Sequence, residues 1–288
     1  MTINKLSFYG LIVSILSIIA GAVVRATGSG DGCGASWPTC NGAIIPELKT
    51  SSELIEFSHR SISGILLIIT LIILLMSFKE DVQALHKKII WLLTFFVLLE
   101  ALIGAVIVIY EWVGLNSSTP RIIAVPLHLV NTFGLLGSYT ILFYLTKKSK
   151  YSLKNFFDRG FKIGLFLFLL SGATGSIAAL ADVIFPSQSF ISGLAEDFDS
   201  NSSILTRLRI LHPIVALALS AYLFSESTRL QNEYKIKTNN IKLLVLIGIL
   251  LGVLNVFSNI ILPLSILHLL IADLLWIVYV YKSAEKIR

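Results

Sequence analysis

Four of the five histidines lie inside long apolar segments, and each stands at nearly the same distance from one end of its segment. They are His59, His128, His212 and His268. That distance is about five to seven residues, or roughly 8 to 10 Å at the rise of an α-helix. An imidazole within hydrocarbon is costly unless it pairs, carries protons or binds a metal, so four at one level indicate a shared task. Axial ligation of haem iron is the task that suits them.

The apolar segments themselves predict an all-α integral membrane protein. Of the 288 residues, 55% are hydrophobic and only 14% are charged, which excludes an ordinary soluble domain. A membrane-spanning helix needs about 20 mostly apolar residues. Eight stretches meet this length: 6–26, 55–77, 89–110, 122–146, 161–183, 206–226, 241–262 and 264–283. We therefore expect eight transmembrane helices.

The basic residues predict the orientation of these helices, because cytoplasmic loops hold an excess of Lys and Arg. With the N-terminus inside, 17 of the 23 basic residues fall on the inner side, which favours an N-in, C-in protein of the plasma membrane. His86 is then expected in a polar inner loop. Two long loops, near 27–54 and 184–205, face outward, so the active side is expected at the outer face. The net charge of +6 is a topology signal and not a nucleic-acid footprint. Cleavage of residues 1–26 as a signal peptide is disfavoured, because no clean small-residue site follows.

An internal repeat is indicated by the histidines, which occupy the even-numbered members of two sets of four segments. Glu56-Phe-Ser-His59 in the first set aligns with Arg209-Ile-Leu-His212 in the second. We expect two pseudo-repeated four-helix bundles, residues 1–150 and 151–288, each able to hold a cofactor in its core. A planar macrocycle between two helices would be bound by His59 with His128, and by His212 with His268. The alternative is that each histidine only hydrogen-bonds between helices.

Both cysteines, Cys33 and Cys40, fall in the first long loop, where an exterior compartment would permit a disulfide. A structural disulfide is favoured over a redox-active pair, since spacing alone gives no evidence of a reactive thiol. The absence of a Cys-x-x-Cys-His motif excludes covalent haem attachment. Four glycines of the same loop, Gly28, Gly30, Gly32 and Gly34, are expected to permit a tight cap over the first haem slot.

Three polar side chains within or at the start of apolar segments are candidates for chemistry or for packing. Glu56 precedes His59 by three residues, which places both on one helix face about one turn apart. A carboxylate there could take a proton or stabilise positive charge. It could instead only complement the helix dipole, but Glu53 already does so behind an N-cap at Ser51 or Ser52. Glu100 is interpreted either as a hydrogen-bonding partner across the bundle or as part of a proton path. Asn255 stands at a comparable depth in the seventh segment, and there too polar packing and a proton relay both stay open.

Five arginines stand at helix ends near the histidine level, where haem propionates would need bidentate partners. These candidate contacts are Arg25, Arg60, Arg121, Arg207 and Arg209. Ordinary interfacial snorkelling is the alternative. The acids of the second long loop, Glu196, Asp197 and Asp199, are expected to form a solvated acidic surface.

The chain resembles the haem A synthase family over essentially its whole length. The resemblance depends on Gly21-Ala-Val-Val-Arg-Ala-Thr-Gly-Ser-Gly-Asp-Gly-Cys-Gly-Ala-Ser-Trp-Pro-Thr-Cys40-Asn-Gly, on Glu56-Phe-Ser-His59-Arg60, and on the eight-segment repeat with its four histidines. The second half departs from the family pattern. Pro213 follows His212 where members often have Arg, and the second long loop lacks the cysteine pair of some members.

The resemblance implies an enzyme that oxidises a ring methyl of haem O to the formyl group of haem A, by successive hydroxylations with water-derived oxygen, for terminal oxidase biogenesis. It implies that His59 and His128 bind the substrate haem, that His212 and His268 ligate a resident haem b, and that Glu56 is the catalytic carboxylate. Implied partners are haem O, haem O synthase, oxidase assembly factors and membrane lipid. The alternatives are a dihaem b-type electron-transfer protein and a haem-free proton-coupled transporter.

Overall fold

The computed structural model describes residues 2–79, 82–147 and 156–287, and the regular secondary structure of these residues is helical. The elements are α1 (Ile3–Ala26), η1 (Ser29–Asp31), α2 (Ser51–Lys79), α3 (Ala84–Ile109), α4 (Thr119–Leu145), α5 (Arg159–Ile184), α6 (Phe190–Phe198), α7 (Ile204–Arg207), η3 (Leu208–Ile210), α8 (Leu211–Tyr234), α9 (Asn239–Phe257), α10 (Leu262–Ala284) and η4 (Glu285–Ile287). Within the described residues, eight helical segments are long and apolar enough to cross a membrane, which confirms the predicted fold class.

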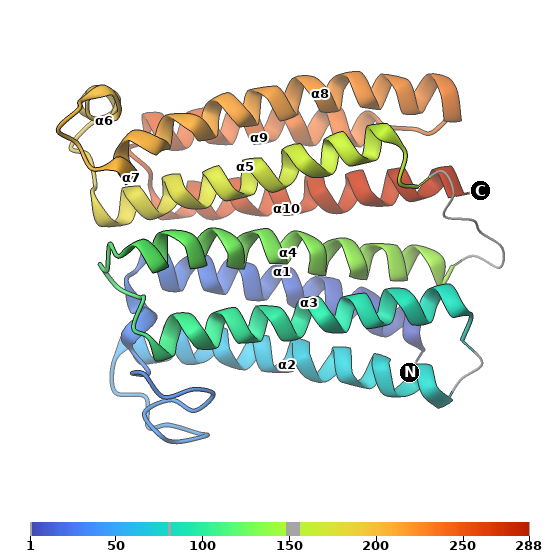
Figure 1. Cartoon of the computed structure of the whole chain (residues 1–288), viewed down its shortest axis with the longest axis horizontal. Coiled ribbons are helices and arrows are strands. Elements are labelled where there is room, and N and C mark those ends of the chain that lie inside the picture. Colours follow the sequence, from blue (N-terminus) through green and yellow to red (C-terminus); the bar gives the residue numbers. More distant parts are fainter. Residues whose placement is uncertain (1, 80–81, 148–155, 288) are drawn as a thin grey trace.

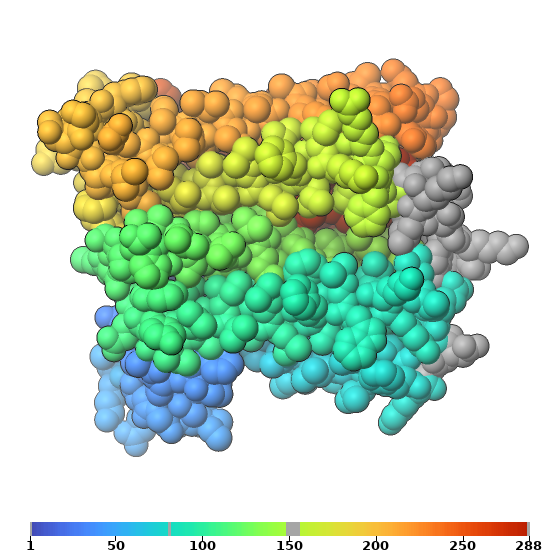
Figure 2. Space-filling model, in the orientation of Figure 1, coloured from blue at the N-terminus to red at the C-terminus, as the bar shows by residue number. Residues whose placement is uncertain are grey.

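The long helices run side by side in two groups, α1–α4 and α5 with α8–α10 (Figure 1). In each group consecutive spans pair closely: α1 packs on α2, α3 on α4, α5 on α8, and α9 on α10. The connections 27–50 and 185–203 lie at one end of the molecule, which we call the long-loop end, and both bulge from it in the space-filling view (Figure 2). The start of α1 and the end of η4 lie at the opposite end (Figure 1).

The sixth span illustrates how local sequence shapes a helix. It was predicted at 206–226, but it runs over Ile204–Tyr234 as α7, η3 and α8 in succession. Pro213, the third residue of α8, has no N–H to donate to the carbonyl of Arg209. The backbone tightens into η3 at that point, and the helix continues beyond it.

One hydrophobic core extends through both groups of helices, with α4 and α10 at its centre. The indole Nε1 of Trp276 donates to the carbonyl of Phe133 at 2.9 Å, which ties α10 to α4. Tyr139 of α4 is fully buried against Gly10 of α1 and bonds to the hydroxyl of Thr70 on α2 at 2.7 Å. A Cβ on Gly10 would lie 2.2 Å from the tyrosine ring, so this close approach requires glycine.

One sequence expectation was wrong, and others concern features that the described residues do not test. His86 was expected in a loop, but it is a buried residue in the first turn of α3, because α3 begins earlier than the apolar run. The boundary between residues 150 and 151 lies outside the described residues, as do several of the basic residues that set the orientation: Lys148, Lys150, Lys154 and Arg288. The pseudo-repeat and the N-in, C-in orientation stay predictions.

A cluster of ion pairs joins three helical elements at the end of the molecule opposite the long loops. Asp158 caps the N-terminus of α5 and accepts hydrogen bonds from Phe161 N, Arg229 Nη2 and Lys286 Nζ at 2.7–2.8 Å. The Lys286 side chain is fully buried. Burial opposes ionisation of Asp158, but the hydrogen bonds outweigh it and hold the pKa of this carboxyl below its ordinary value. The cluster therefore joins α5, α8 and η4 through one carboxylate.

Replacing Asp158 with asparagine is expected to destabilise the protein by about 3 kcal/mol at neutral pH, because it leaves the charge of Lys286 buried without its partner. An Asp with a lowered folded-state pKa stabilises above its ordinary pKa and loses that contribution as the pH falls through the folded-state value. The difference between parent and variant should thus persist at pH 7 and narrow below about pH 4. Thermal unfolding in detergent across this range measures it.

Glu233 supplies the matched control, since it also pairs with Arg229, at 3.1 Å, but its side chain is 56% exposed. Glu233→Gln should change stability by less than about 1 kcal/mol. Equal effects of the two substitutions would contradict the stabilising role of the buried cluster.

Candidate haem-binding site

The structure places all four intramembrane histidines at the same end of the molecule, the long-loop end. His59 lies on α2, His128 on α4, His212 on α8 and His268 on α10. Each of these helices begins at that end (Figure 1), and each histidine stands within its first few turns. The shared depth read from the sequence is thus reproduced in three dimensions.

His212 and His268, one of the two predicted pairs, have their rings in contact. Their ring centroids are 6.2 Å apart, and the ring planes are inclined at 83°. Two imidazoles that ligate one metal from opposite sides, with metal–nitrogen distances of about 2 Å, have centroids about 6 Å apart. The spacing of this pair fits a single iron between the rings.

His59 and His128 form the other predicted pair, within the α1–α4 group. Both residues are partly buried, and 29% of the His128 side chain is exposed. The structure thus places His59 and His128 in one group of helices, and it brings the rings of His212 and His268 into contact in the other.

Each histidine ring lies against a glycine of the preceding span, a feature that the sequence reading missed. A Cβ built on these glycines would approach the Cε1 atom of the ring at 3.0 Å for Gly21 and His59, 3.6 Å for Gly104 and His128, 2.9 Å for Gly175 and His212, and 3.1 Å for Gly252 and His268. The glycines let the rings approach the neighbouring backbone and fix where they stand. The signal in the sequence was a glycine near the same end of each odd-numbered span.

Packing alone does not explain these rings. The buried Nδ1 atoms of His59 and His212 make no hydrogen bond, although interhelical hydrogen bonding was the alternative to metal ligation. Interhelical hydrogen bonding through these atoms therefore does not hold the two rings in place. The close-fitting glycines and the 6.2 Å spacing of His212 and His268 fit bis-histidine ligation of a haem.

Glu56 is held beneath the first long loop, one turn from His59. Its side chain is 3% exposed. Oε2 accepts from the backbone N–H of Cys33 at 2.8 Å, and Oε1 accepts from Nε and Nη2 of Arg60 at 3.1 and 2.5 Å. Arg60 also donates to the loop carbonyls of Ser36 and Thr39. The carboxyl is thus fixed between the loop and the histidine helix, with a donor on each oxygen.

The loop over Glu56 is closed by the predicted disulfide, with an S–S distance of 2.01 Å between Cys33 and Cys40. Gly34 has φ +61°, the left-handed conformation that glycine adopts without strain. Gly32 packs against α2, where a Cβ would lie 2.5 Å from the backbone of Ser52. These contacts agree with the expected tight, disulfide-braced cap.

The helix below this cap begins one residue earlier than expected. The N-cap was predicted at Ser51 or Ser52, but the hydroxyl of Thr50 accepts from Glu53 N at 3.2 Å, and Glu53 Oε2 accepts from Thr50 N at 3.1 Å. This reciprocal pair is a capping box. Glu53 therefore caps the N-terminus of α2, as expected. Glu56 is not needed for that role.

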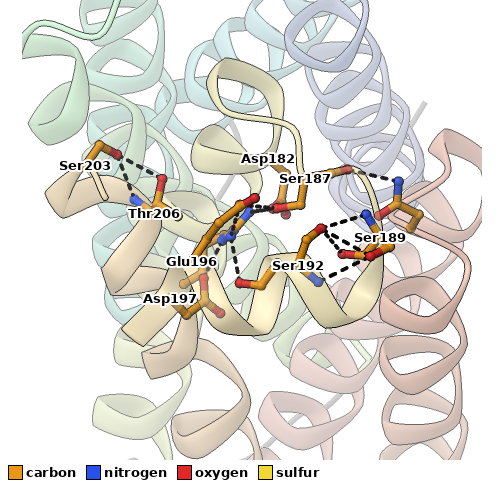
Figure 3. Close-up of polar contacts among 11 residues, drawn as sticks. Asp182, Ser187, Ser189, Ser192, Glu196, Asp197, Ser203 and Thr206 are labelled. Atoms are coloured by element: carbon orange, nitrogen blue, oxygen red, sulfur yellow. Dashed lines mark hydrogen bonds and ion pairs between the residues drawn. The ribbon is translucent and has the colours of Figure 1, made fainter. Parts of the chain in front are cut away.

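The second long loop folds around Arg209, the residue aligned with Glu56. Asp182, Glu196 and Asp197 bind its guanidinium at 3.1, 3.3 and 2.8 Å, and Ser187 adds a hydrogen bond (Figure 3). The expectation that the acids of this loop form a solvated surface was wrong for Glu196 and Asp197. Both form ion pairs with Arg209, which also binds Asp182, and these contacts tie α6 to α5 and η3.

The other candidate propionate contacts differ in their partners. Arg121 is buried and donates through Nη1 to three carbonyls of the α3–α4 connection, while its Nε has no partner. The Nε of Arg25, on α1, is also buried without a partner. Arg207 is exposed. Unsatisfied donors at this level would suit an anionic group, so Arg25 and Arg121 are the arginines that fit propionates best.

Glu100 and Asn255, the other polar residues considered within the apolar segments, have partners on neighbouring helices. Asn255 and Ser265 exchange hydrogen bonds at 3.1 and 3.2 Å, which confirms polar packing between α9 and α10. Glu100 Oε2 accepts from Asn131 Nδ2 at 2.5 Å, and Glu100 Oε1 lies 3.1 Å from His128 Nδ1. The interpretation of Glu100 as a partner across the bundle is confirmed.

The fold and the site define a class: multi-pass membrane proteins with paired intramembrane histidines suited to haem. The chain belongs to the COX15–CtaA family of cytochrome oxidase assembly proteins, whose sequence profile matches residues 4–280. Membership in this family implies that haem is involved in its function.

Individual relatives agree with this assignment. A Thermus thermophilus protein named "Protoheme IX farnesyltransferase" is 32% identical over 286 residues, covering 96% of this chain and 47% of that protein. "Heme A synthase" of Staphylococcus epidermidis is 38% identical over 112 residues, covering 38% of this chain and 37% of that protein. The protein of the same name from Staphylococcus aureus is 37% identical over 112 residues, with the same shares of the two chains covered, 38% and 37%. The chain spans less than half of the length of these relatives in each match.

Proposed function

We propose that this chain is a haem A synthase, which oxidises a ring methyl of haem O to the formyl group of haem A for terminal oxidase biogenesis. One observation carries the proposal: the two halves differ at the position three residues before the aligned histidine. Glu56 stands there in the first half and Arg209 in the second. Only the first of these positions offers a carboxyl group beside a histidine pair. An electron carrier would have no need of that difference.

The residues of the two halves then take different tasks. His59 and His128 hold the substrate haem, and His212 with His268 holds a resident haem b. Haem bound at these histidines would supply the redox chemistry, passing the electrons removed from the methyl group on to an external electron acceptor. Glu56 accepts a proton from the water whose oxygen is incorporated, or stabilises positive charge on the carbon. The Cys33 N–H and Arg60 orient this carboxyl, as their hydrogen bonds to its two oxygens support.

The environment of the site supports further assignments. Arg25 and Arg121, whose Nε atoms are buried without partners, bind haem propionates in this proposal. The disulfide-braced cap limits the entry of bulk water to the first site. We place the protein in the plasma membrane, with the long-loop end outward.

A supplier of farnesylated haem is the partner that this function requires. The Thermus thermophilus relative carries the name of a protohaem farnesyltransferase and is about twice as long as its match to this chain. Haem O, the product of haem farnesylation, is the proposed substrate here. We therefore propose a haem O synthase as the protein that acts immediately before this one, and oxidase assembly factors as the recipients of its product.

Pigment analysis tests the function directly. Expressed in cells that make haem O but no haem A, the chain should give rise to haem A in acid–acetone extracts, resolved by reversed-phase chromatography. A dihaem electron carrier would bind haem b and leave haem O unconverted. A proton-coupled transporter would be purified without a Soret band. Either of these results would rule out the proposal.

A further inference from the structure

The residue four positions before a histidine-facing glycine contacts the Nδ1 atom of the ring in two of the four cases. Nδ1 of His268 lies 3.1 Å from the carbonyl oxygen of Gly248, four residues before Gly252. The Nδ1 atoms of His59 and His212 make no hydrogen bond.

At His128 a side chain takes the place of this backbone carbonyl. Glu100 lies four residues before Gly104, and its Oε1 is 3.1 Å from Nδ1 of His128, at hydrogen-bonding distance although off the ideal angle. Glu100 is itself held in place: Asn131 Nδ2 donates to its Oε2 at 2.5 Å and to the carbonyl of Phe96 at 2.8 Å. The acid is thus anchored between α3 and α4 and directed at one histidine.

We propose that Glu100 is a positioning residue for His128, whose carboxyl group takes the Nδ1–H and directs Nε2 toward the haem of the first half. The inference rests on the proposed haem-binding role of His128. Histidines that ligate metals commonly give their other N–H to a carboxylate or a carbonyl, which fixes the tautomer and raises the basicity of the ligand. A carboxylate is the stronger acceptor of the two.

A difference between the two haem sites follows. The first-half haem would be ligated by one imidazole with a carboxyl partner. In the second half, His268 has a backbone carbonyl beside Nδ1, and Nδ1 of His212 makes no hydrogen bond. A more electron-donating ligand stabilises ferric over ferrous iron. Because of this carboxyl partner, the haem of the first half should have a lower midpoint potential than the haem of the second half.

Glu100→Gln in the full-length protein tests this idea. The protein is purified in detergent, loaded with protohaem, and titrated with reductant while its Soret spectrum is recorded. One of the two haems should favour the ferrous state about tenfold more than in the parent, a rise of about 59 mV for a one-electron couple, while the other haem stays unchanged. The low-spin ferric EPR signal of the same haem should move.

Glu100→Leu removes the acceptor entirely and introduces a residue suited to a membrane helix. Protohaem titrated into this apoprotein should bind to one site 10- to 100-fold more weakly. Thr94→Val is the control on the same helix, because the buried Thr94 hydroxyl donates to the carbonyl of Ile90. Thr94→Val should leave both midpoint potentials, both EPR signals and the affinity for protohaem as in the parent.

The inference is overturned if Glu100→Gln leaves both potentials and both EPR signals as in the parent, or if Thr94→Val reproduces its effects. These outcomes are separate from those that test the proposed function. A parent protein that binds two haems and makes no haem A would refute the synthase assignment, yet the potential of one haem could still depend on Glu100. Absence of haem binding would refute both.

Discussion

Replacing Glu56 with glutamine is expected to abolish the conversion of haem O while both haem sites stay filled. The amide keeps the shape of the side chain but cannot accept a proton as a carboxylate does. Loss of a positioned acid–base group typically reduces a rate by a factor of about 10² to 10⁴. Haem A should therefore fall below detection in pigment extracts, while the spectrum of the purified protein retains its bis-histidine haem bands. Glu56→Asp, which retracts the carboxyl, should restore only part of the activity.

Glu53→Gln provides the matched control for this substitution. Glu53 is on the same helix and three residues away, but its carboxylate caps the helix through Lys49 N and Thr50 N. Its replacement should cost about 1 kcal/mol of stability and leave the amount of haem A unchanged. Haem A formation by Glu56→Gln at the parental level would exclude Glu56 from catalysis. Loss of haem from that variant would show instead that Glu56 supports binding.

The helical architecture could be predicted because one physical constraint dominates it. In hydrocarbon every backbone N–H and C=O must be satisfied within the segment, so a run of about 20 apolar residues has helix as its available form. Boundaries were less certain, since polar residues also extend helices beyond the lipid. α8 shows this, as its apolar stretch was expected to end at 226 and the helix continues to Tyr234.

The site could be predicted only as far as it depends on the cost of polar groups in a membrane. This cost singled out the four histidines and Glu100. Glu56 was chosen instead by its spacing from His59 and by the family resemblance. The fate of the loop acids could not be predicted, because the pairing of Arg209 with Glu196 and Asp197 depends on how residues 185–203 fold back over α5. The glycines beside the rings were missed for a related reason. Apolar segments contain many glycines, and only the packing of helices shows which of them face a histidine.

Glu56 and Arg209, the residues aligned between the two halves, have different ionic surroundings. In the first half a carboxyl is buried under the cap and paired with one arginine, Arg60. In the second half three acids surround one arginine, so negative charge is in excess there. In the proposed function the first arrangement would belong to the reactive site and the second to the site of the retained cofactor.

Gly175→Ala is expected to empty the second-half haem site, because the added methyl would stand 2.9 Å from Cε1 of His212. The backbone of α5 cannot yield easily in the packed core, so the ring must turn or shift. A displacement of that kind takes His212 off the common axis that its 6.2 Å spacing from His268 defines. We expect binding of protohaem at this site to weaken at least tenfold, measured by Soret titration of the apoprotein. Haem A formation should fall with it, since the resident haem b is then missing.

Gly104→Ala is the graded comparison at the corresponding position of the first half. Its methyl would lie 3.6 Å from Cε1 of His128, an ordinary van der Waals contact, so haem affinity should change by less than about twofold. The contrast matters because both substitutions are chemically identical and both lie within apolar helices. If Gly104→Ala and Gly175→Ala weaken haem binding equally, the effect reflects helix packing in general. If neither does, the glycines do not set the positions of the rings, and the bis-histidine geometry must be fixed by other contacts.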